Sequence, residues 1–304
     1  MTGAPVPEIP ATLVDAIVFL RGPEEGRAWL AALPGRIADH AARWGLTPRA
    51  IAEGGAMSCC LLCTTADRGE AVLKIPVDAD AGRREMRILD GWAGTGAAPG
   101  VLRREPDTGV FLMERVRPGT TAWARGGPSD SARFGELLGR LSTVPAATGL
   151  RDLAEVAEMR LGWARDRFAG SGNAAELARV ADAAAVLDAL LGTTARRHLL
   201  HADLQAKNIL EGPDGRWFAI DPLGAVGDLN AEAALWAAVQ DGPASIRDRL
   251  TELADCPELD AGRLAAWTYV FAIAEHRPYL PDPARRITAF LDGVDGRALI
   301  DALT

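Results

Sequence analysis

The chain of 304 residues is acidic, since 41 acidic residues outnumber 33 basic ones and give a net charge of −8, and 48% of it is hydrophobic. That length and apolar content suffice for a large buried core, in one two-part domain or two smaller ones. The charge argues against nucleic-acid and anionic-membrane partners and favours a cationic ligand. With no apolar run near the roughly 18 residues of a membrane span, and no secretory leader, we expect a cytoplasmic protein without membrane contact.

Helical patterns occupy the first part of the chain. A short helix is predicted over 13–20, and a second begins at Pro23, which is followed by two glutamates in the expected first turn. Apolar residues then recur at a spacing of four. Pro34 lies inside this run, and because proline lacks the N–H of the helical ladder, we expect it to break the helix into two pieces.

After residue 49 the pattern changes to short strands joined by glycine-containing turns, with one helix. The expected elements are a strand end at 51–53, strands over 59–65 and 71–75, a helix over 83–89, and a hairpin of 101–104 with 110–113. Three of the four cysteines lie in the strand 59–65, with no second Cys/His pair at zinc-site spacing. We interpret them as small buried strand residues.

The chain beyond residue 117 is mostly helical in pattern, with one break for a polar hairpin near residue 200. Helices are expected around 134–141 and over 153–168, 174–191, 230–239, 246–253, 261–275 and 282–291.

The hairpin carries the chemistry. An apolar lead-in is followed by His-Ala-Asp-Leu-Gln-Ala-Lys-Asn at 201–208, then a strand, a turn at 212–215, and a second strand ending in Asp221. Such a hairpin places Asp203, Asn208 and Asp221 on one edge. Phosphoryl transfer needs a carboxylate to accept the proton of the attacking hydroxyl, and an amide and a carboxylate to hold magnesium on nucleotide phosphates. The spacing H-x-D-x-x-x-x-N followed by a hydrophobic-Asp strand is typical of that chemistry.

Lysine is nearly absent from the chain, which contains only Lys74 and Lys207. Lys207 lies inside the polar loop, where contact with a phosphate and a solvent-facing role are both open. Lys74 lies in the predicted strand 71–75, and Glu85, eleven residues later, is its expected ion-pair partner.

The block from His201 to Asp228 resembles the aminoglycoside/hydroxyurea phosphotransferase family, in its streptomycin 6-kinase-like branch. The matching residues are H-x-D-x-x-x-x-N, then I-D-P-x-x-x-V-G-D at 220–228, with Glu-Glu-Gly-Arg-Ala-Trp-Leu at 24–30. The resemblance implies an α+β, protein-kinase-like two-lobed fold, with a small β-rich nucleotide lobe (1–113) and a larger helical lobe (114–304). It also implies ATP and Mg²⁺ as cofactors and a small hydroxylated molecule as substrate, in a monomer or homodimer.

The resemblance assigns roles to individual residues. Asp203 orients the acceptor hydroxyl and takes its proton, and Asn208 and Asp221 bind Mg²⁺. On the nucleotide side, Lys74 holds the phosphates with help from Glu85. The Gly-Gly loop at 54–58, ending in Ser58, covers the phosphates, and the backbone of Glu114 and Val116 meets adenine. His201 is expected to hold the loop in place rather than to take part in catalysis. Asp228 is expected to hold the loop after the Mg²⁺ strand, and a contact with the substrate stays open for it.

The acceptor is predicted from charge. From Asp228 onward the chain has thirteen acids, seven arginines and no lysine, in the region that builds the acceptor pocket of the resembled family. A cleft lined by carboxylates attracts cations. We therefore expect a polyhydroxylated cationic antibiotic, streptomycin-like, that contacts Asp241 and Glu275 with Trp236 as a wall, its phosphorylation giving resistance. Gln205 stands where many streptomycin-type kinases have His. A same-fold kinase for another natural product or metabolite (hydroxyurea, a nucleoside or a peptide antibiotic) and a nucleotide-binding pseudokinase stay open.

Overall fold

A computed structural model describes the chain apart from residues 1–5, 54–56, 68, 126–129 and 147. The chain forms two compact units, one of residues 1–93 and 99–116 and one of residues 94–98 and 117–304. The division after Val116 lies three residues beyond the boundary that we placed after Met113, and the short stretch 94–98 belongs to the second unit. Within the described ranges, no helix has the length and apolar character needed to cross a bilayer.

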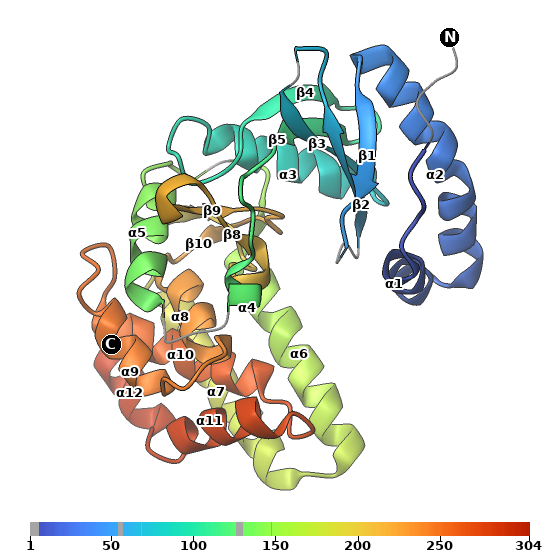
Figure 1. Cartoon of the computed structure of the whole chain (residues 1–304). Coiled ribbons are helices and arrows are strands. Elements are labelled where there is room, and N and C mark those ends of the chain that lie inside the picture. Colours follow the sequence, from blue (N-terminus) through green and yellow to red (C-terminus); the bar gives the residue numbers. More distant parts are fainter. Residues whose placement is uncertain (1–5, 54–56, 68, 126–129, 147) are drawn as a thin grey trace. The chain divides into compact units, whose positions relative to one another are not determined.

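The first unit is built on an antiparallel sheet in the order β1-β2-β3-β5-β4 (Figure 1). Its strands are β1 (Thr47–Ile51), β2 (Ser58–Thr64), β3 (Glu70–Pro76), β4 (Val101–Glu105) and β5 (Val110–Glu114). Helices α1 (Ala11–Arg21) and α2 (Pro23–Trp44) contribute to a buried apolar cluster with the sheet, and α3 (Ala79–Gly91) contacts β3, β4 and β5.

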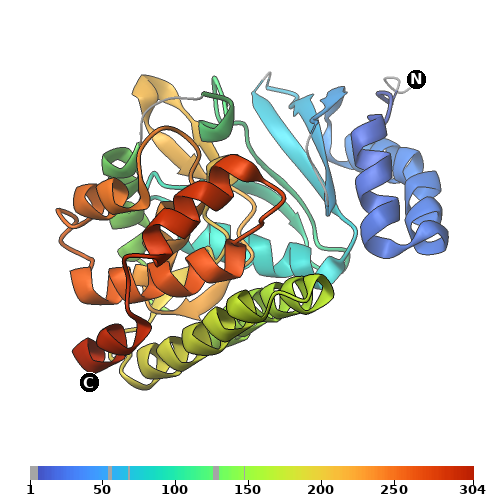
Figure 2. The same cartoon turned by 90° about the horizontal axis from the view of Figure 1, so that it is seen from below.

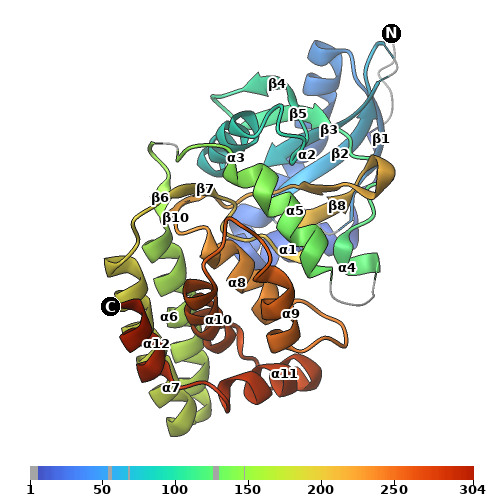
Figure 3. The same ribbon diagram turned by 90° about the vertical axis from the view of Figure 1, so that its left-hand side faces the viewer.

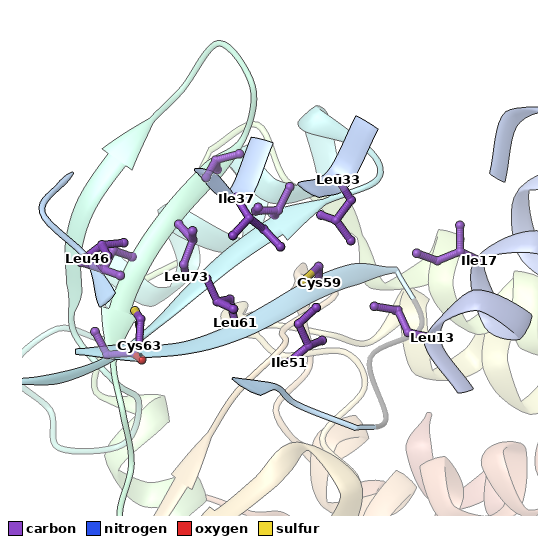
Figure 4. Close-up of a cluster of buried hydrophobic side chains, with 14 residues drawn as sticks. Leu13, Ile17, Leu33, Ile37, Leu46, Ile51, Cys59, Leu61, Cys63 and Leu73 are labelled. Carbon is purple, nitrogen blue, oxygen red and sulfur yellow. Dashed lines mark hydrogen bonds between the residues drawn. The ribbon is translucent and has the colours of Figure 1, made fainter. Parts of the chain in front are cut away.

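Side chains along each strand point alternately to the two faces of the sheet. Cys59, Leu61 and Cys63 of β2 and Leu73 of β3 point into the cluster under α1 and α2 (Figure 4). The two cysteines are buried there, as expected of small strand residues. Because neighbouring residues of a strand face opposite sides, Lys74 is directed to the face that α3 covers.

The helix α2 continues through Pro34 without interruption, so the predicted break is wrong. Leu33 and Ile37, on either side of the proline, are both fully buried in the apolar cluster with the sheet. The burial of both halves of the helix on one sheet offsets the backbone hydrogen bond that is lost at Pro34. A prediction from local sequence counts only the lost hydrogen bond and not this packing.

The second unit is mainly helical, with α10 (Ala261–Glu275) at its centre, in contact with α6 (Leu153–Ser171), α7 (Ala174–Gly192) and α8 (Asn230–Val239) (Figure 3). The helices α6 and α7 pack side by side (Figure 2). The remaining helices of the described part are α4 (Ala122–Arg125), α5 (Ser131–Ser142), α9 (Ile246–Leu253), α11 (Pro281–Leu291) and α12 (Gly296–Leu303).

Short strands join the helices of this unit to the polar loop. Strands β6 (Arg151–Asp152), β10 (Ala225–Gly227) and β7 (His198–Leu200) form one sheet in that order, and β8 (Ile209–Glu211) pairs with β9 (Trp217–Ala219) in a hairpin. β7 leads into the loop at 201–208, and β9 ends two residues before Asp221. The predicted α+β class is confirmed.

Gly227 fixes how closely α6 approaches β10, because a Cβ built at this position would lie 2.4 Å from the Cβ of Leu153. We expect Gly227→Ala to lower the free energy of unfolding by about 1–3 kcal/mol, the usual cost of overpacking. Urea unfolding measures the change. Gly162→Ala in α6, where an added Cβ meets nothing within 4 Å, is the matched control, and we expect it to be neutral or stabilising. An equal loss in both variants would contradict the steric explanation.

Candidate active site

The polar loop has a fixed internal structure. The N–H of Gln205 donates to the carbonyl of Asp203 (2.8 Å), and the N–H of Asn208 donates to the carbonyl of Gln205 (2.8 Å). Ala202 has a φ of +65°, a left-handed conformation that non-glycine residues seldom adopt. This turn directs the side chain of the next residue, Asp203, onto a cluster of donors.

Four donors surround the carboxylate of Asp203. Its Oδ1 accepts from Arg160 Nη2 (2.7 Å) and Gln205 Nε2 (2.5 Å). Its Oδ2 accepts from Asn208 Nδ2 (3.1 Å) and lies 3.1 Å from Lys207 Nζ. Burial by itself raises the pKa of this carboxyl, but the charges of Lys207 and Arg160 outweigh it, so the pKa is lowered. Asp203 is therefore an ionised, oriented hydrogen-bond acceptor.

Asn208 and Asp221 are linked through the hairpin. The N–H of Ile220 donates to the carbonyl of Asn208 (2.9 Å), which brings the following residue, Asp221, alongside the loop. Asp221 is exposed and has a φ of +58°. The Nδ2 of Asn208 donates to the carbonyl and carboxylate of Asp203, so Oδ1 is the atom of this amide that could coordinate a metal. One carboxylate and one amide oxygen fit Mg²⁺, which takes few protein ligands and completes its shell with phosphates and water.

His201 holds the loop to the strand that precedes Asp221. Its Nε2 donates to the carbonyl of Ile220 (2.8 Å), and its Nδ1 accepts from the N–H of Asp203 (3.2 Å). A carbonyl can only accept and an N–H can only donate, so these contacts require the neutral ring protonated at Nε2. Burial lowers the pKa of His201 and favours the same form.

Two further carboxylates act as anchors of the loops. The Oε1 of Glu232, buried on α8, accepts from the N–H of Ala202 (2.6 Å), and burial raises the pKa of this carboxyl to about 7. Asp228, also buried, accepts from Arg263 Nε and Trp267 Nε1, both at 2.7 Å. Asp228 therefore holds its loop as predicted, whereas the anchoring role of Glu232 was missed in the sequence.

The sequence also missed Arg160, which comes from the buried side of α6. Besides Asp203, this side chain contacts Glu275 Oε1 (2.6 Å) at the end of α10 and the carbonyl of Ala202 (3.3 Å). The other oxygen of Glu275, Oε2, is 2.9 Å from Arg277 Nη2. The expected substrate contact of Glu275 is thus corrected, because both its oxygens are held by arginines and its side chain is only 9% exposed.

The other two predicted acceptor residues lie apart from this network. Trp236 is fully buried, stacked on Phe134 with ring centroids 4.6 Å apart, and its Nε1 donates to Ser131 Oγ (3.3 Å). It is a core residue and leaves no face for a ligand, since α8 is buried on all sides, so the prediction of a pocket wall is wrong. Asp241 follows α8, is 60% exposed at its side chain, and pairs with Arg286 at 3.0 Å.

The expected nucleotide residues lie in the first unit. Lys74 Nζ and Glu85 Oε1 are 2.7 Å apart in a buried ion pair between β3 and α3. Ser58 is buried at the start of β2, and residues 54–56 of the Gly-Gly loop lie outside the described residues. Glu114 ends β5, where its N–H donates to the carbonyl of Gly100 (2.9 Å) and its carboxylate accepts from the N–H of Gly100 (3.0 Å). Val116 is the last residue of this unit.

Comparison with known proteins identifies the family of the chain. A family model described as aminoglycoside/hydroxyurea antibiotic resistance kinase matches residues 43–276. The chain is 31% identical to a streptomycin 6-kinase of Streptomyces glaucescens, over 88% of this chain and 90% of that one. It is 35% identical to a hydroxyurea phosphotransferase of Kitasatospora aureofaciens, over 86% of this chain and 77% of that one.

The fold is shared more widely. The structure of a choline/ethanolamine kinase family protein from Mesorhizobium loti superposes with a TM-score of 0.57, covering 92% of this chain and 94% of that one at 21% identity. This likeness confirms the protein-kinase-like fold. The sequence relatives, both phosphotransferases of small molecules, confirm the expectation of an enzyme that phosphorylates small molecules, and a kinase of this family implies ATP as the phosphoryl donor. The chain belongs to the aminoglycoside/hydroxyurea antibiotic resistance kinase family.

Proposed function

We propose that the protein transfers the γ-phosphoryl group of ATP to a hydroxyl of an antibiotic, with Asp203 as the group that receives the hydroxyl proton. The observation that carries this proposal is the carboxylate of Asp203, kept ionised by Arg160 and Lys207 at the head of an H-x-D-x-x-x-x-N loop. A charged, oriented acceptor is what a hydroxyl nucleophile needs as it attacks phosphorus.

The other residues are proposed to divide the remaining tasks. Asn208 and Asp221 would hold Mg²⁺, which supplies charge neutralisation on the phosphates when it is bound. In the first unit, Lys74 would hold the nucleotide phosphates, with Glu85 fixing its ammonium. Ser58 and the loop before it would contact the phosphates, and the backbone of Glu114 and Val116 would meet adenine.

We propose a streptomycin-like cation as the acceptor. Its support is the 31% identity to a streptomycin 6-kinase, the net charge of −8, and the exposed carboxylate of Asp241. Hydroxyurea is the second candidate, and the 35% identity to a hydroxyurea phosphotransferase favours it. Streptomycin carries guanidinium groups, whereas hydroxyurea is neutral. The dependence of KM on salt concentration therefore distinguishes the two acceptors.

ADP release measured with streptomycin, hydroxyurea and a neutral sugar tests the proposal. With the cationic acceptor we expect KM to rise several-fold as ionic strength increases from about 0.01 to about 0.1 M, because the Debye length falls from about 30 to about 10 Å. Asp241→Asn should reproduce part of that rise at low salt. A preference for hydroxyurea, with KM insensitive to salt, would reject the cationic acceptor. An absence of ADP release above background with any of the three would reject both streptomycin and hydroxyurea as acceptors.

A further inference from the structure

Asp203 has two cationic neighbours that differ in accessibility. The side chain of Lys207 is 51% exposed, whereas that of Arg160 is 6% exposed. An exposed lysine exchanges partners readily, and the ammonium of Lys207 can leave Oδ2 for a phosphate. Arg160 has no such freedom, because its guanidinium is enclosed between α6, the loop and α10.

The contacts of Arg160 form a chain of alternating charge. Arg160 Nη2 binds Asp203 Oδ1 at 2.7 Å, Arg160 Nη1 binds Glu275 Oε1 at 2.6 Å, and Glu275 Oε2 meets Arg277 at 2.9 Å. Charge-assisted bonds of this length are among the strongest in proteins. A buried cation is costly without partners, and here each terminal nitrogen of Arg160 has its own carboxylate.

We infer that Arg160 is a positioning residue that fixes the orientation of the Asp203 carboxylate, with Glu275 as its buried counter-ion. This inference rests on the proposed function of Asp203. With Oδ1 fixed by Arg160, the carboxylate cannot rotate when Lys207 moves away. Oδ2 then presents a lone pair to the incoming hydroxyl in a constant direction. Glu275 binds the other terminal nitrogen of the guanidinium. Arg160 is therefore already oriented to donate through Nη2 to Asp203.

Arg160→Met, Arg160→Lys and Glu275→Gln test the inference through kcat and the KM for ATP. We expect Arg160→Met to lower kcat about 100-fold, the scale of an ångström-sized misplacement. The KM for ATP should stay within about twofold. Arg160→Lys keeps the charge but lacks the two-pronged guanidinium, so it should also lower kcat, by less than Arg160→Met. Glu275→Gln should likewise lower kcat by less than Arg160→Met.

Arg167→Met is the matched control. Arg167 lies two turns further along α6 and donates to the carbonyls of Ala274 (3.4 Å) and His276 (2.8 Å), so it joins α6 to α10 without touching a carboxylate. We expect it to lower the unfolding temperature while kcat and the KM for ATP stay within about twofold of the parent protein. If Arg167→Met and Arg160→Lys lose kcat equally, helix docking explains the loss and the inference is wrong.

Unchanged kcat in Arg160→Lys or in a folded Arg160→Met would also overturn the inference. Should Arg160→Met not fold, Arg160→Lys and Glu275→Gln decide alone, because both keep the size of the side chain. Asp203→Asn separates this failure from failure of the proposed function. If Asp203→Asn loses turnover and the Arg160 variants do not, only the positioning role is rejected.

Discussion

Asp203→Asn should lower kcat by on the order of 10³-fold while the folded structure and nucleotide binding are kept. The amide has the size of the carboxylate but takes no proton at neutral pH. Arg160 keeps Glu275 as a partner at 2.6 Å, so the variant does not leave an isolated buried cation. Steady-state ADP release gives kcat, nucleotide titration gives the affinity, and thermal unfolding checks the fold.

Asp214→Asn is the matched control for this variant. Asp214 lies in the turn between β8 and β9, is exposed, and has a φ of +56°, which asparagine tolerates. The same chemical change there should leave kcat unaltered. Turnover of Asp203→Asn within about tenfold of the parent protein would mean that another group receives the proton, and the proposed mechanism would fail.

Asp221→Ala should remove the part of ATP affinity that depends on Mg²⁺ and lower turnover by on the order of 10³-fold, because a metal supplies several kcal/mol of charge stabilisation. Titration of ATP with and without Mg²⁺ measures the effect directly. The left-handed backbone at Asp221 disfavours alanine, so Asp221→Asn, which fits that backbone, separates the lost charge from local strain. If Mg²⁺ still strengthens ATP binding in both variants, the metal is held by other residues.

Local patterns predicted the parts of the fold whose cause is local. The helices α9 and α10 have the predicted bounds, since Ser245 caps one and Asp260 the other, each accepting from a backbone N–H of the first turn. The strands β2 to β5 followed from their turns, whereas β1 (Thr47–Ile51) lies ahead of the strand end predicted at 51–53. The sheet of β6, β10 and β7 was missed, because strands of two or three residues carry no usable periodicity. The helix α12 was also missed.

The loop at 201–208 was recognisable because its functional groups are neighbours in sequence. Its supports are not neighbours, for Arg160 lies 43 residues before Asp203 and 115 residues before Glu275. Nothing in the helical pattern around Arg160 distinguishes it from the other arginines of α6. The number of acidic residues was a poor guide to the acceptor contacts for a similar reason, because it treated Glu232, Glu275 and Asp241 alike. The side chains of Glu232 and Glu275 are largely buried and bind other groups of the protein, whereas that of Asp241 is exposed.

The two lysines of the chain give it an unusual surface chemistry. Lys74 is 3% exposed and paired with Glu85, whereas Lys207 is half exposed beside Asp203. Amine-selective reagents therefore find a single accessible lysine, at the fourth residue after Asp203. A fluorophore or isotope label attached through an amide at Lys207 would report on this loop without any engineered cysteine. Attachment also removes the ammonium charge, so the labelled protein shows how Asp203 behaves when Arg160 is its one cationic partner among the described residues.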